Sequence, residues 1–354
     1  MRIFTFPVFQ LFAAASLSIL CATAGSAFDA SGHEIGQPVA QRVSQNIAQT
    51  LGQTTDLVGV SASQGTKAES DWRDLPGFRS WSARTSKPSA AILCIHGLGL
   101  NSGAFDDFGT RMAQKGILVF AIDVRGFGAW MKKKDGDHLD FEGSVADIKQ
   151  TLSAIRRDHP GLPVFLLGES MGGAIVLKAG SQFPQLMDGL ISSAPGGQRY
   201  KQGKTDLDVG LHVLIRPGKQ FDIGTAIVDQ ATKDPALRKV WLSSPLNRMD
   251  LSPAQLIEFQ LFMDGNDSAV SKIKTLPVLV LQGTQDKLVE PDDTWKIFTK
   301  ISSKQKRMIA LRSEHLILEY GRVKSDFYNS KVTEMVASWM EEAVSPLFAG
   351  EYAD

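Results

Sequence analysis

The sequence predicts an α/β fold in which a mostly parallel central sheet is covered by helices on both faces and interrupted by an inserted helical cap. Short apolar runs alternate with helical patterns from residue 90 onward, as in chains that build parallel sheets. One of these runs leads into a glycine-bracketed serine and then into a helical pattern. A helical interval over 196–274, too long for an ordinary crossover, separates the fourth run from the fifth and predicts the cap.

Two segments are expected before the core. Residues 1–27 have the pattern of a secretory signal peptide, with Arg2 as the only charge before an apolar stretch that ends in small residues. We therefore expect export to the periplasm or outside the cell, or membrane anchoring if the signal stays uncleaved. Residues 28–75 form a polar extension, in which apolar residues recur every four positions between Pro38 and Gly52 and predict a short amphipathic helix.

The core is predicted over 76–195 and 275–345. Its strands are expected at six apolar runs, which are Ala91–Ile95, Ile117–Ile122, Val164–Leu167, Leu190–Ser192, Val278–Leu281 and Met308–Leu311. Apolar residues make up 43% of the chain and the net charge is zero, so we expect a full core and no nucleic-acid partner. The two cysteines are Cys21, in the N-terminal apolar segment, and Cys94, in a predicted core strand, and no disulfide is expected between them.

The third run enters Gly168-Glu169-Ser170-Met171-Gly172 before the helical pattern begins. A serine on such a strand-to-helix turn has a strained backbone and an exposed hydroxyl, and the small flanking residues let strand and helix approach closely. The helix N-terminus supplies N–H groups and partial positive charge where an oxyanion develops. Ser170 is therefore the predicted nucleophile of a serine hydrolase.

A serine hydroxyl needs an adjacent base, and that base needs an orienting carboxylate. In this architecture both partners follow the serine, each just past the C-terminal end of a strand. Asp286 follows the fifth run after a glycine turn and His315 follows the sixth, so we predict them as acid and base. Three further carboxylates, where the next helix is expected to begin, are rivals for the acid: Glu290, Asp292 and Asp293.

The loop after the first run, His96-Gly97-Leu98-Gly99, can aim backbone N–H groups at the oxyanion site. The expected donors are the N–H groups of Leu98 and Met171. We expect His96 to brace the loop rather than to take part in the chemistry. The sequence has no metal-ligand cluster and no dinucleotide fingerprint, so neither a metal nor a cofactor is implied.

With these features in place, the chain resembles the α/β-hydrolase superfamily and, within it, the monoacylglycerol lipase and lysophospholipase group. The resemblance covers roughly residues 75–345. It is most specific over 158–174, which look nearly identical to the elbow region of that family. The Gly-Glu-Ser-Met-Gly-Gly form is similar to plant members, some of which act on phenolic esters. Residues 276–286 and 314–315 match the acid and base segments of the family.

The resemblance implies an α/β-hydrolase fold with Ser170, Asp286 and His315 as nucleophile, acid and base. It also implies Leu98 and Met171 as oxyanion donors. Two features depart from the family: the signal peptide with its long extension, and the cap, which matches no known cap closely. The resemblance therefore informs the type of reaction better than it informs the substrate.

We expect an exported serine ester hydrolase that forms an acyl-enzyme. The expected substrate is a single-chain lipid, monoacylglycerol or lysophospholipid, because a helical cap can form an apolar tunnel, and transient contact of the cap with a membrane surface is expected as well. Alternatives on the same scaffold are an esterase for short-chain or phenolic esters, a peptidase, a thioesterase, an acyltransferase and a catalytically silent binding protein. A membrane-tethered interaction protein that uses the helix over 38–52 is a further alternative.

Overall fold

The computed structural model describes residues 72–82, 87–196, 221–222, 224–321 and 325–345. The chain divides into two units between Glu69 and Ser70, and every described residue belongs to the second unit. The predicted signal peptide and amphipathic helix lie outside the described residues, as do Cys21 and part of the predicted cap.

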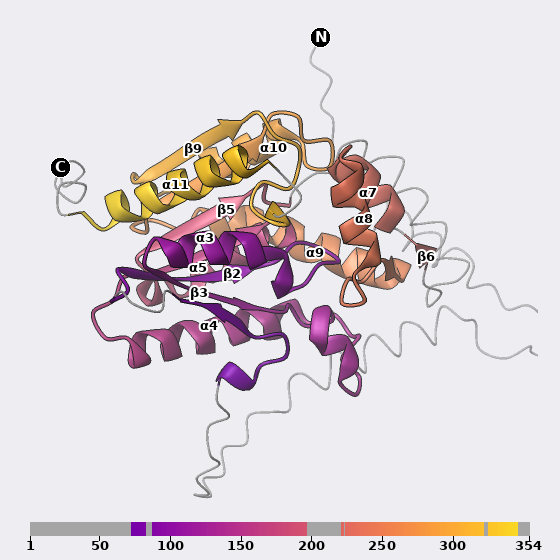
Figure 1. Ribbon diagram of the computed structural model, residues 1–354, viewed down its shortest axis with the longest axis horizontal. Helices are drawn as coiled ribbons and strands as arrows, with labels where there is room; N and C mark the ends of the chain where they lie inside the picture. The colour runs from indigo at the N-terminus through magenta and orange to yellow at the C-terminus, as the bar shows by residue number, and fades with distance from the viewer. Residues whose placement is uncertain (1–71, 83–86, 197–220, 223, 322–324, 346–354) are drawn as a thin grey trace, which may run out of the picture. The chain divides into compact units, whose positions relative to one another are not determined.

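A seven-stranded sheet in the order β1-β3-β2-β4-β5-β8-β9 forms the centre of this unit (Figure 1). The six parallel strands are β2 (Ala90–Ile95), β3 (Ile117–Ile122), β4 (Val164–Glu169), β5 (Gly189–Ser193), β8 (Val278–Gly283) and β9 (Lys306–Leu311). They confirm the six predicted runs, each extended by at most two residues at an end. The edge strand β1 (Arg79–Trp81) pairs antiparallel with β3, and three residues are too few to show the alternation that would predict it.

Helices cover both faces of the sheet, as predicted. The core helices are α3 (Asp106–Gln114), α4 (Phe141–Asp158), α5 (Met171–Gln182), α10 (Pro291–Lys300) and α11 (Asp326–Ala343). Side chains of β2 alternate between the two layers: Leu93 and Ile95 join the cluster with α4 and α5, whereas Ile92 and Cys94 join the cluster with α3 and α11. Because both faces are covered, central strands such as β2 and β3 are apolar throughout rather than alternating.

Four short 3-10 helices lie in the connections: η1 (Trp72–Asp74), η2 (Ser102–Phe105), η3 (Gly128–Lys132) and η4 (Pro184–Leu186). Local side chains fix where several longer helices begin. The Asp140 carboxylate accepts a hydrogen bond from Gly143 N at the start of α4, and Ser325 caps α11 through Tyr328 N. These caps satisfy backbone donors that a helix leaves unpaired in its first turn.

Between β5 and β8 the described part of the chain forms α7 (Gly224–Ala231), α8 (Pro235–Ser243) and α9 (Pro253–Val270). A short antiparallel pair, β6 (Phe221–Asp222) with β7 (Asp250–Leu251), also lies here, although the sequence predicts only helices in this interval. Strands of two residues carry no periodic signal. The apolar cluster of α7 and α8 includes Leu100 and Leu316 from the core loops, so these helices pack directly over the C-terminal ends of the strands.

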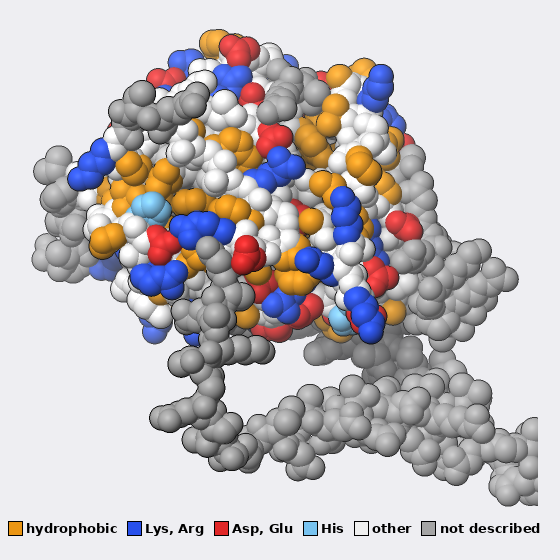
Figure 2. All heavy atoms as spheres, turned by 60° about the horizontal axis from the view of Figure 1, so that its bottom comes forward, with side chains coloured by type: hydrophobic (Ala, Val, Ile, Leu, Met, Phe, Trp, Pro, Cys, Tyr) orange, Lys and Arg blue, Asp and Glu red, His pale blue; other side chains and the backbone are white. Residues whose placement is uncertain are grey.

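No helix within the described ranges is both long enough and apolar enough to cross a membrane. Figure 2 shows Lys and Arg interspersed with Asp and Glu over the face in view, in keeping with the net charge of zero.

Candidate active site

Ser170 lies between the end of β4 and the start of α5 and has the backbone angles φ 57° and ψ −118°. L residues rarely adopt a positive φ, and such a conformation costs about 1–3 kcal/mol unless the surroundings enforce it. Here the strand fixes one side through a 2.8 Å hydrogen bond from Ser170 N to Ser193 O. A Cβ on Gly168 would overlap the backbone of Gly172, and a Cβ on Gly172 would overlap Ile95 O. The two glycines therefore permit the close strand–helix contact that the sequence predicts.

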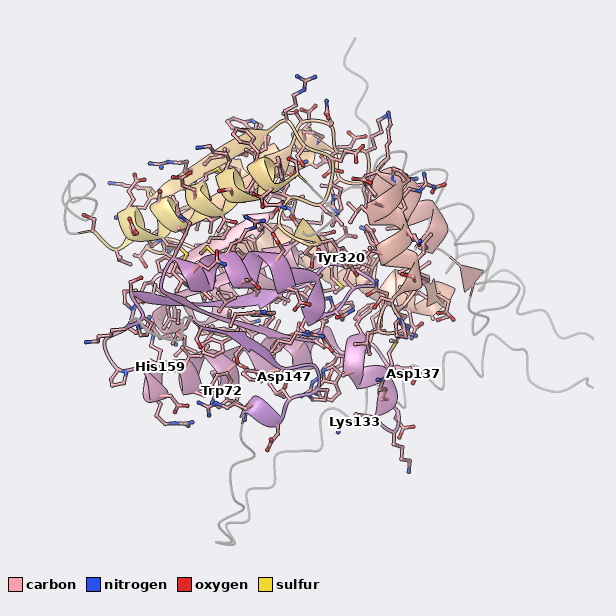
Figure 3. All side chains as sticks on the ribbon, viewed as in Figure 1. Trp72, Lys133, Asp137, Asp147, His159 and Tyr320 are labelled. Atoms are coloured by element: carbon pink, nitrogen blue, oxygen red, sulfur yellow. The ribbon has the colours of Figure 1, made fainter. Side chains whose placement is uncertain are left out.

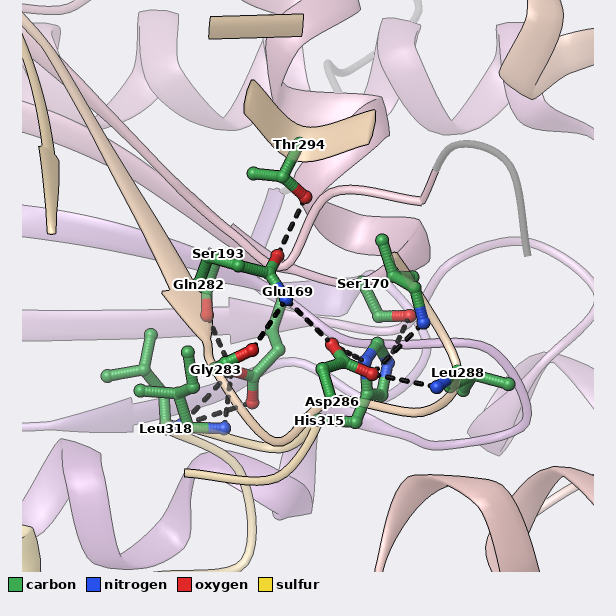
Figure 4. A network of polar contacts seen from close by, with 12 residues as sticks. Glu169, Ser170, Ser193, Gln282, Gly283, Asp286, Leu288, Thr294, His315 and Leu318 are labelled. Carbon is green, nitrogen blue, oxygen red and sulfur yellow. Dashed lines mark hydrogen bonds and ion pairs between the residues drawn. The ribbon is translucent and has the colours of Figure 1, made fainter. Parts of the chain in front are cut away.

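The three residues predicted as nucleophile, base and acid meet at the C-terminal edge of the sheet (Figure 4). His315 Nε2 lies 2.8 Å from Ser170 Oγ, and His315 Nδ1 lies 2.8 Å from Asp286 Oδ2. His315 is 1% exposed and Asp286 is 6% exposed, so the chain of hydrogen bonds is shielded from water. With Nδ1 donating to the carboxylate, Nε2 carries the lone pair that can accept the serine proton.

Asp286 is held from several sides. Its Oδ1 accepts hydrogen bonds from Leu288 N at 2.8 Å and Val289 N at 3.0 Å. Burial by itself raises the pKa of the Asp286 carboxyl, but the charge and hydrogen bond of His315 and the two backbone N–H groups outweigh it and lower the pKa below its usual value. Asp286 is therefore ionised at neutral pH.

The rival carboxylates occupy a different place. Glu290 is the residue just before α10, and Asp292 and Asp293 lie in the first turn of that helix, where negative charge suits the helix dipole. Asp293 forms an ion pair with Lys296 at 2.6 Å. The carboxylate that contacts His315 is that of Asp286.

The two predicted oxyanion donors flank Ser170. Met171 is the first residue of α5, and Leu98 lines the same cavity as Ser170. The loop that carries Leu98 lies close to Ser170, since a Cβ on Gly97 would lie 3.4 Å from Ser170 Cβ. His96 braces the loop, as expected: its Nε2 accepts from Val124 N at 2.9 Å and its Nδ1 lies 2.8 Å from Gly97 O. Burial lowers the pKa of His96, which favours the neutral ring that this pairing needs.

Ser170 opens into a small cavity of about 30 Å³. Apart from Ser170 and His315 its lining is apolar, and four of the lining side chains come from the cap helices: Ile227, Trp241, Phe259 and Met263. A Cβ on Gly196 would overlap the Met263 methyl and lie 3.7 Å from Ser170 O, so the Met263 side chain lies close to Ser170.

Sequence reasoning gives no role to Gln282, Glu169 or Glu319, which surround the predicted residues. Gln282 Nε2 donates to Asp286 Oδ2 at 3.1 Å, and Thr294 Oγ1 donates to Gln282 Oε1 at 2.7 Å, so the amide is fixed on both sides (Figure 4). The available signal was a polar residue at the end of an otherwise apolar strand, since such a residue must find a buried partner.

The loop of the predicted oxyanion donor is also tied to the chain segment between α8 and α9. Arg248 N donates to Gly99 O at 2.8 Å, and Asn101 Nδ2 donates to Asn247 Oδ1 at 2.7 Å. Asn247 Nδ2 in turn donates to the hydroxyl of Tyr320, at 2.7 Å. Figure 3 shows Tyr320 where the core meets the cap helices.

The Arg248 guanidinium extends this link to a further core loop. Its Nη1 donates to Gly126 O at 2.9 Å and to Asp137 O at 2.6 Å.

In the part of the chain that the structure describes, no group of three or more His, Cys, Asp or Glu side chains could hold a metal ion.

Comparison with known proteins identifies the family of this chain. A family model described as serine aminopeptidase, S33 matches residues 86–317. Human monoglyceride lipase is 28% identical over 229 residues, which cover 63% of this chain and 74% of that protein. Mouse monoglyceride lipase is 26% identical over 306 residues, which cover 82% of this chain and 98% of that protein.

Among solved structures, a soluble variant of monoglyceride lipase from Saccharomyces cerevisiae, in complex with a substrate analogue, is similar with a TM-score of 0.65. It is 20% identical, and the likeness covers 80% of this chain and 100% of that chain. At this identity the structural likeness shows the fold, and the family match over 86–317 spans more than half of the sequence. The chain therefore belongs to the serine aminopeptidase S33 family and is a serine hydrolase with the α/β-hydrolase fold.

Proposed function

We propose that this serine carboxylester hydrolase cleaves single-chain lipid esters, monoacylglycerol or lysophospholipid, through Ser170, His315 and Asp286. The observation that carries the proposal is the hydrogen-bond chain through these three side chains at the floor of an apolar cavity. The similarity to proteins named monoglyceride lipase supports the lipid ester as substrate.

The mechanism follows from the arrangement of these atoms. His315 Nε2 takes the proton of Ser170 Oγ as the oxygen attacks the ester carbonyl carbon, and the N–H groups of Leu98 and Met171 stabilise the oxyanion. His315 then gives the proton to the leaving alcohol, which departs and leaves an acyl group on Ser170. A water molecule, activated by the same imidazole, releases the fatty acid and restores the serine. Asp286 holds Nδ1–H throughout and stabilises the transient imidazolium.

The cavity lining favours an acyl chain over a peptide. An aminopeptidase must bind a free amino group, which calls for a carboxylate near the nucleophile. Among the described residues that line the cavity, none is acidic, and the side chains from α8 and α9 are Trp241, Phe259 and Met263. These apolar surfaces suit the desolvation of a hydrocarbon chain.

Contact with a lipid surface is part of the proposal. Two large apolar side chains on the cap helices are exposed, Leu242 on α8 at 45% and Leu261 on α9 at 57%. Leu242→Gln and Leu261→Gln together should weaken co-flotation with neutral phosphatidylcholine vesicles while leaving turnover of a dissolved short ester unchanged. Equal flotation of wild type and the double variant would remove the cap from this role.

Export is proposed as well, on the pattern of residues 1–27. The mass of the protein recovered from outside the cytoplasm tests it, because cleavage after Ala24 or Ala27 fixes the mass of the mature chain. Full-length protein in the cytoplasm would overturn this part alone.

The test of the function is hydrolysis of p-nitrophenyl esters from acetyl to palmitoyl, followed by monoacylglycerol and lysophospholipid, with the Ser170→Ala variant alongside. Ser153→Ala is the matched control, because its exposed hydroxyl only donates to Lys149 O on the surface of α4. We expect activity that rises with chain length, disappears in Ser170→Ala and persists in Ser153→Ala. Serine-dependent activity confined to short esters would replace the lipid substrate with an acetyl or phenolic ester, and activity that survives Ser170→Ala would refute the nucleophile.

A further inference from the structure

Glu169, the residue before Ser170, is completely buried and its carboxylate accepts hydrogen bonds from four donors. Three are consecutive backbone N–H groups of the loop that follows His315: Ile317 N at 2.8 Å, Leu318 N at 3.1 Å and Glu319 N at 2.8 Å. The fourth is Ser193 Oγ at 2.7 Å, from the neighbouring strand β5. Figure 4 shows this carboxylate beside the Ser170–His315–Asp286 chain.

Burial of the Glu169 carboxylate carries a desolvation penalty. A carboxylate taken out of water loses favourable solvation free energy, which its hydrogen-bond partners must restore. The partners of Glu169 are N–H groups whose positions depend on the path of one loop, and three successive N–H groups form an anion-binding concavity. Glu169 therefore links the residue next to the serine to the loop that begins two positions after His315.

A second buried carboxylate continues the link. Glu319, also completely buried, donates its N–H to Glu169, and its Oε1 accepts a hydrogen bond from Gly97 N at 2.9 Å. Gly97 immediately precedes Leu98, the proposed oxyanion donor. Glu169 and Glu319 thus join three loops that lie far apart in the sequence: the serine turn, the histidine loop and the oxyanion loop.

We infer that Glu169 and Glu319 are positioning residues, which hold His315 and the Leu98 N–H in register with Ser170. The inference rests on the proposed function, because it assigns to the two carboxylates the placement of the groups named there. Neither carboxylate touches the substrate. Glu169 acts through the backbone of the histidine loop, and Glu319 acts through Gly97.

The two carboxylates should affect different steps of the same reaction. Displacement of His315 weakens proton donation to the leaving alcohol, which an alkyl ester needs and a p-nitrophenyl ester does not, since p-nitrophenolate leaves without a proton. Displacement of Leu98 weakens the oxyanion site, which both esters use. A shift of about 1 Å in such groups can cost about a hundredfold in rate.

The variants are Glu169→Gln, whose NH₂ group must face a backbone N–H donor whichever way the amide turns, and Glu319→Leu, which removes the acceptor of Gly97 N. We expect Glu169→Gln to lower kcat/KM about 100-fold on monoacylglycerol and about tenfold on the matched p-nitrophenyl ester. Glu319→Leu should lower both by a similar factor, about tenfold or more. In neither variant should KM change by more than about threefold, because substrate contacts are untouched.

Asp147→Asn is the matched control. Asp147 is a buried carboxylate on α4 that binds Arg125 through two hydrogen bonds of 2.7 and 2.8 Å, away from the histidine loop. It should lower Tm and leave kcat/KM on both esters unchanged at temperatures where the protein is folded. If Glu169→Gln behaves in the same way, the carboxylate only stabilises the fold and the inference is overturned.

Ser193→Ala keeps the test decisive if Glu169→Gln does not fold, because it removes one donor and leaves the carboxylate in place. We expect it to lower kcat/KM on monoacylglycerol about threefold more than on the p-nitrophenyl ester. An equal effect on both esters would count against the inference. Ser170→Ala separates the two failures: if it is inactive while the glutamate variants behave like Asp147→Asn, only the positioning role falls, whereas an active Ser170→Ala refutes the proposed function itself.

Discussion

The floor and the roof of the cavity over Ser170 are built in opposite ways. On the floor, His315, Asp286 and Gln282 are buried polar side chains, each fixed by hydrogen bonds of defined direction. On the roof, Phe259 and Met263 are apolar and make contacts that depend on shape alone. Hydrogen bonds require a narrow range of distance and angle, whereas apolar contacts tolerate rearrangement. We therefore expect the chemical step to depend on the floor and substrate selection to depend on the roof.

The largest effect on kcat is expected when the floor loses the charged carboxylate that orients His315. Asp286→Asn should reduce kcat by about 10⁴-fold, because the amide stabilises the wrong tautomer of His315 and no longer stabilises the imidazolium. Steady-state kinetics on a p-nitrophenyl ester measures it. Asp293→Asn, which loses the carboxylate paired with Lys296, is the control and should keep wild-type activity. Reversed results would assign the acid to the start of α10.

A smaller loss should follow from the support behind that acid. Gln282→Leu removes one of the four hydrogen-bond donors to the Asp286 carboxylate and loosens its orientation, so kcat should fall about tenfold with KM unchanged. Thr294→Val removes only the donor to the far side of the glutamine and should have a smaller effect in the same direction. Wild-type kcat in Gln282→Leu would show that Leu288 N and Val289 N suffice to orient Asp286.

Substitutions in the roof should change the selectivity for acyl-chain length rather than the rate of the chemical step. Met263→Ala enlarges the cavity beside Ser170, so we expect kcat/KM for palmitoyl over acetyl esters to rise several-fold, while unfolding becomes easier by about 2–5 kcal/mol. Chemical denaturation and a chain-length series measure the two effects. Ser268→Ala, on the exposed side of the same helix, should change neither. An unchanged chain-length profile in Met263→Ala would mean that Met263 does not limit the acyl chain.

The smallest expected effect concerns the pH dependence of stability. The native pKa of Asp286 lies below its usual value, so the ionised carboxylate stabilises the fold above the unfolded-state pKa of about 3.9. This contribution is lost as the pH falls through the lower native pKa. Urea unfolding of wild type and Asp286→Asn between pH 7 and pH 3 should show their difference in unfolding free energy moving against the wild type below about pH 4. A difference independent of pH would contradict the lowered pKa.

Local patterns were enough to predict the strands and to predict that Ser170, Asp286 and His315 lie together. Ser170, Asp286 and His315 each follow an apolar run, and parallel strands bring such positions to one edge. The contacts of Glu169 and Glu319 could not be predicted in this way. The bond from Ile317 N to Glu169 spans 148 residues and that from Gly97 N to Glu319 spans 222, so no local pattern contains both partners. The two-residue strands of the cap escaped for the opposite reason, because they are too short for any period.

The hydrogen bonds from Arg248 N to Gly99 O and from Asn101 Nδ2 to Asn247 Oδ1 have a consequence for protein engineering. They make the cap unsuitable for simple exchange, because the segment between α8 and α9 is hydrogen-bonded to the loop that carries Leu98. A chimera that imports a cap from another hydrolase should keep Asn247 and Arg248 of the recipient, so that both hydrogen bonds survive the exchange. A graft that replaces them would alter turnover of every substrate and hide the change in selectivity that the exchange was meant to produce.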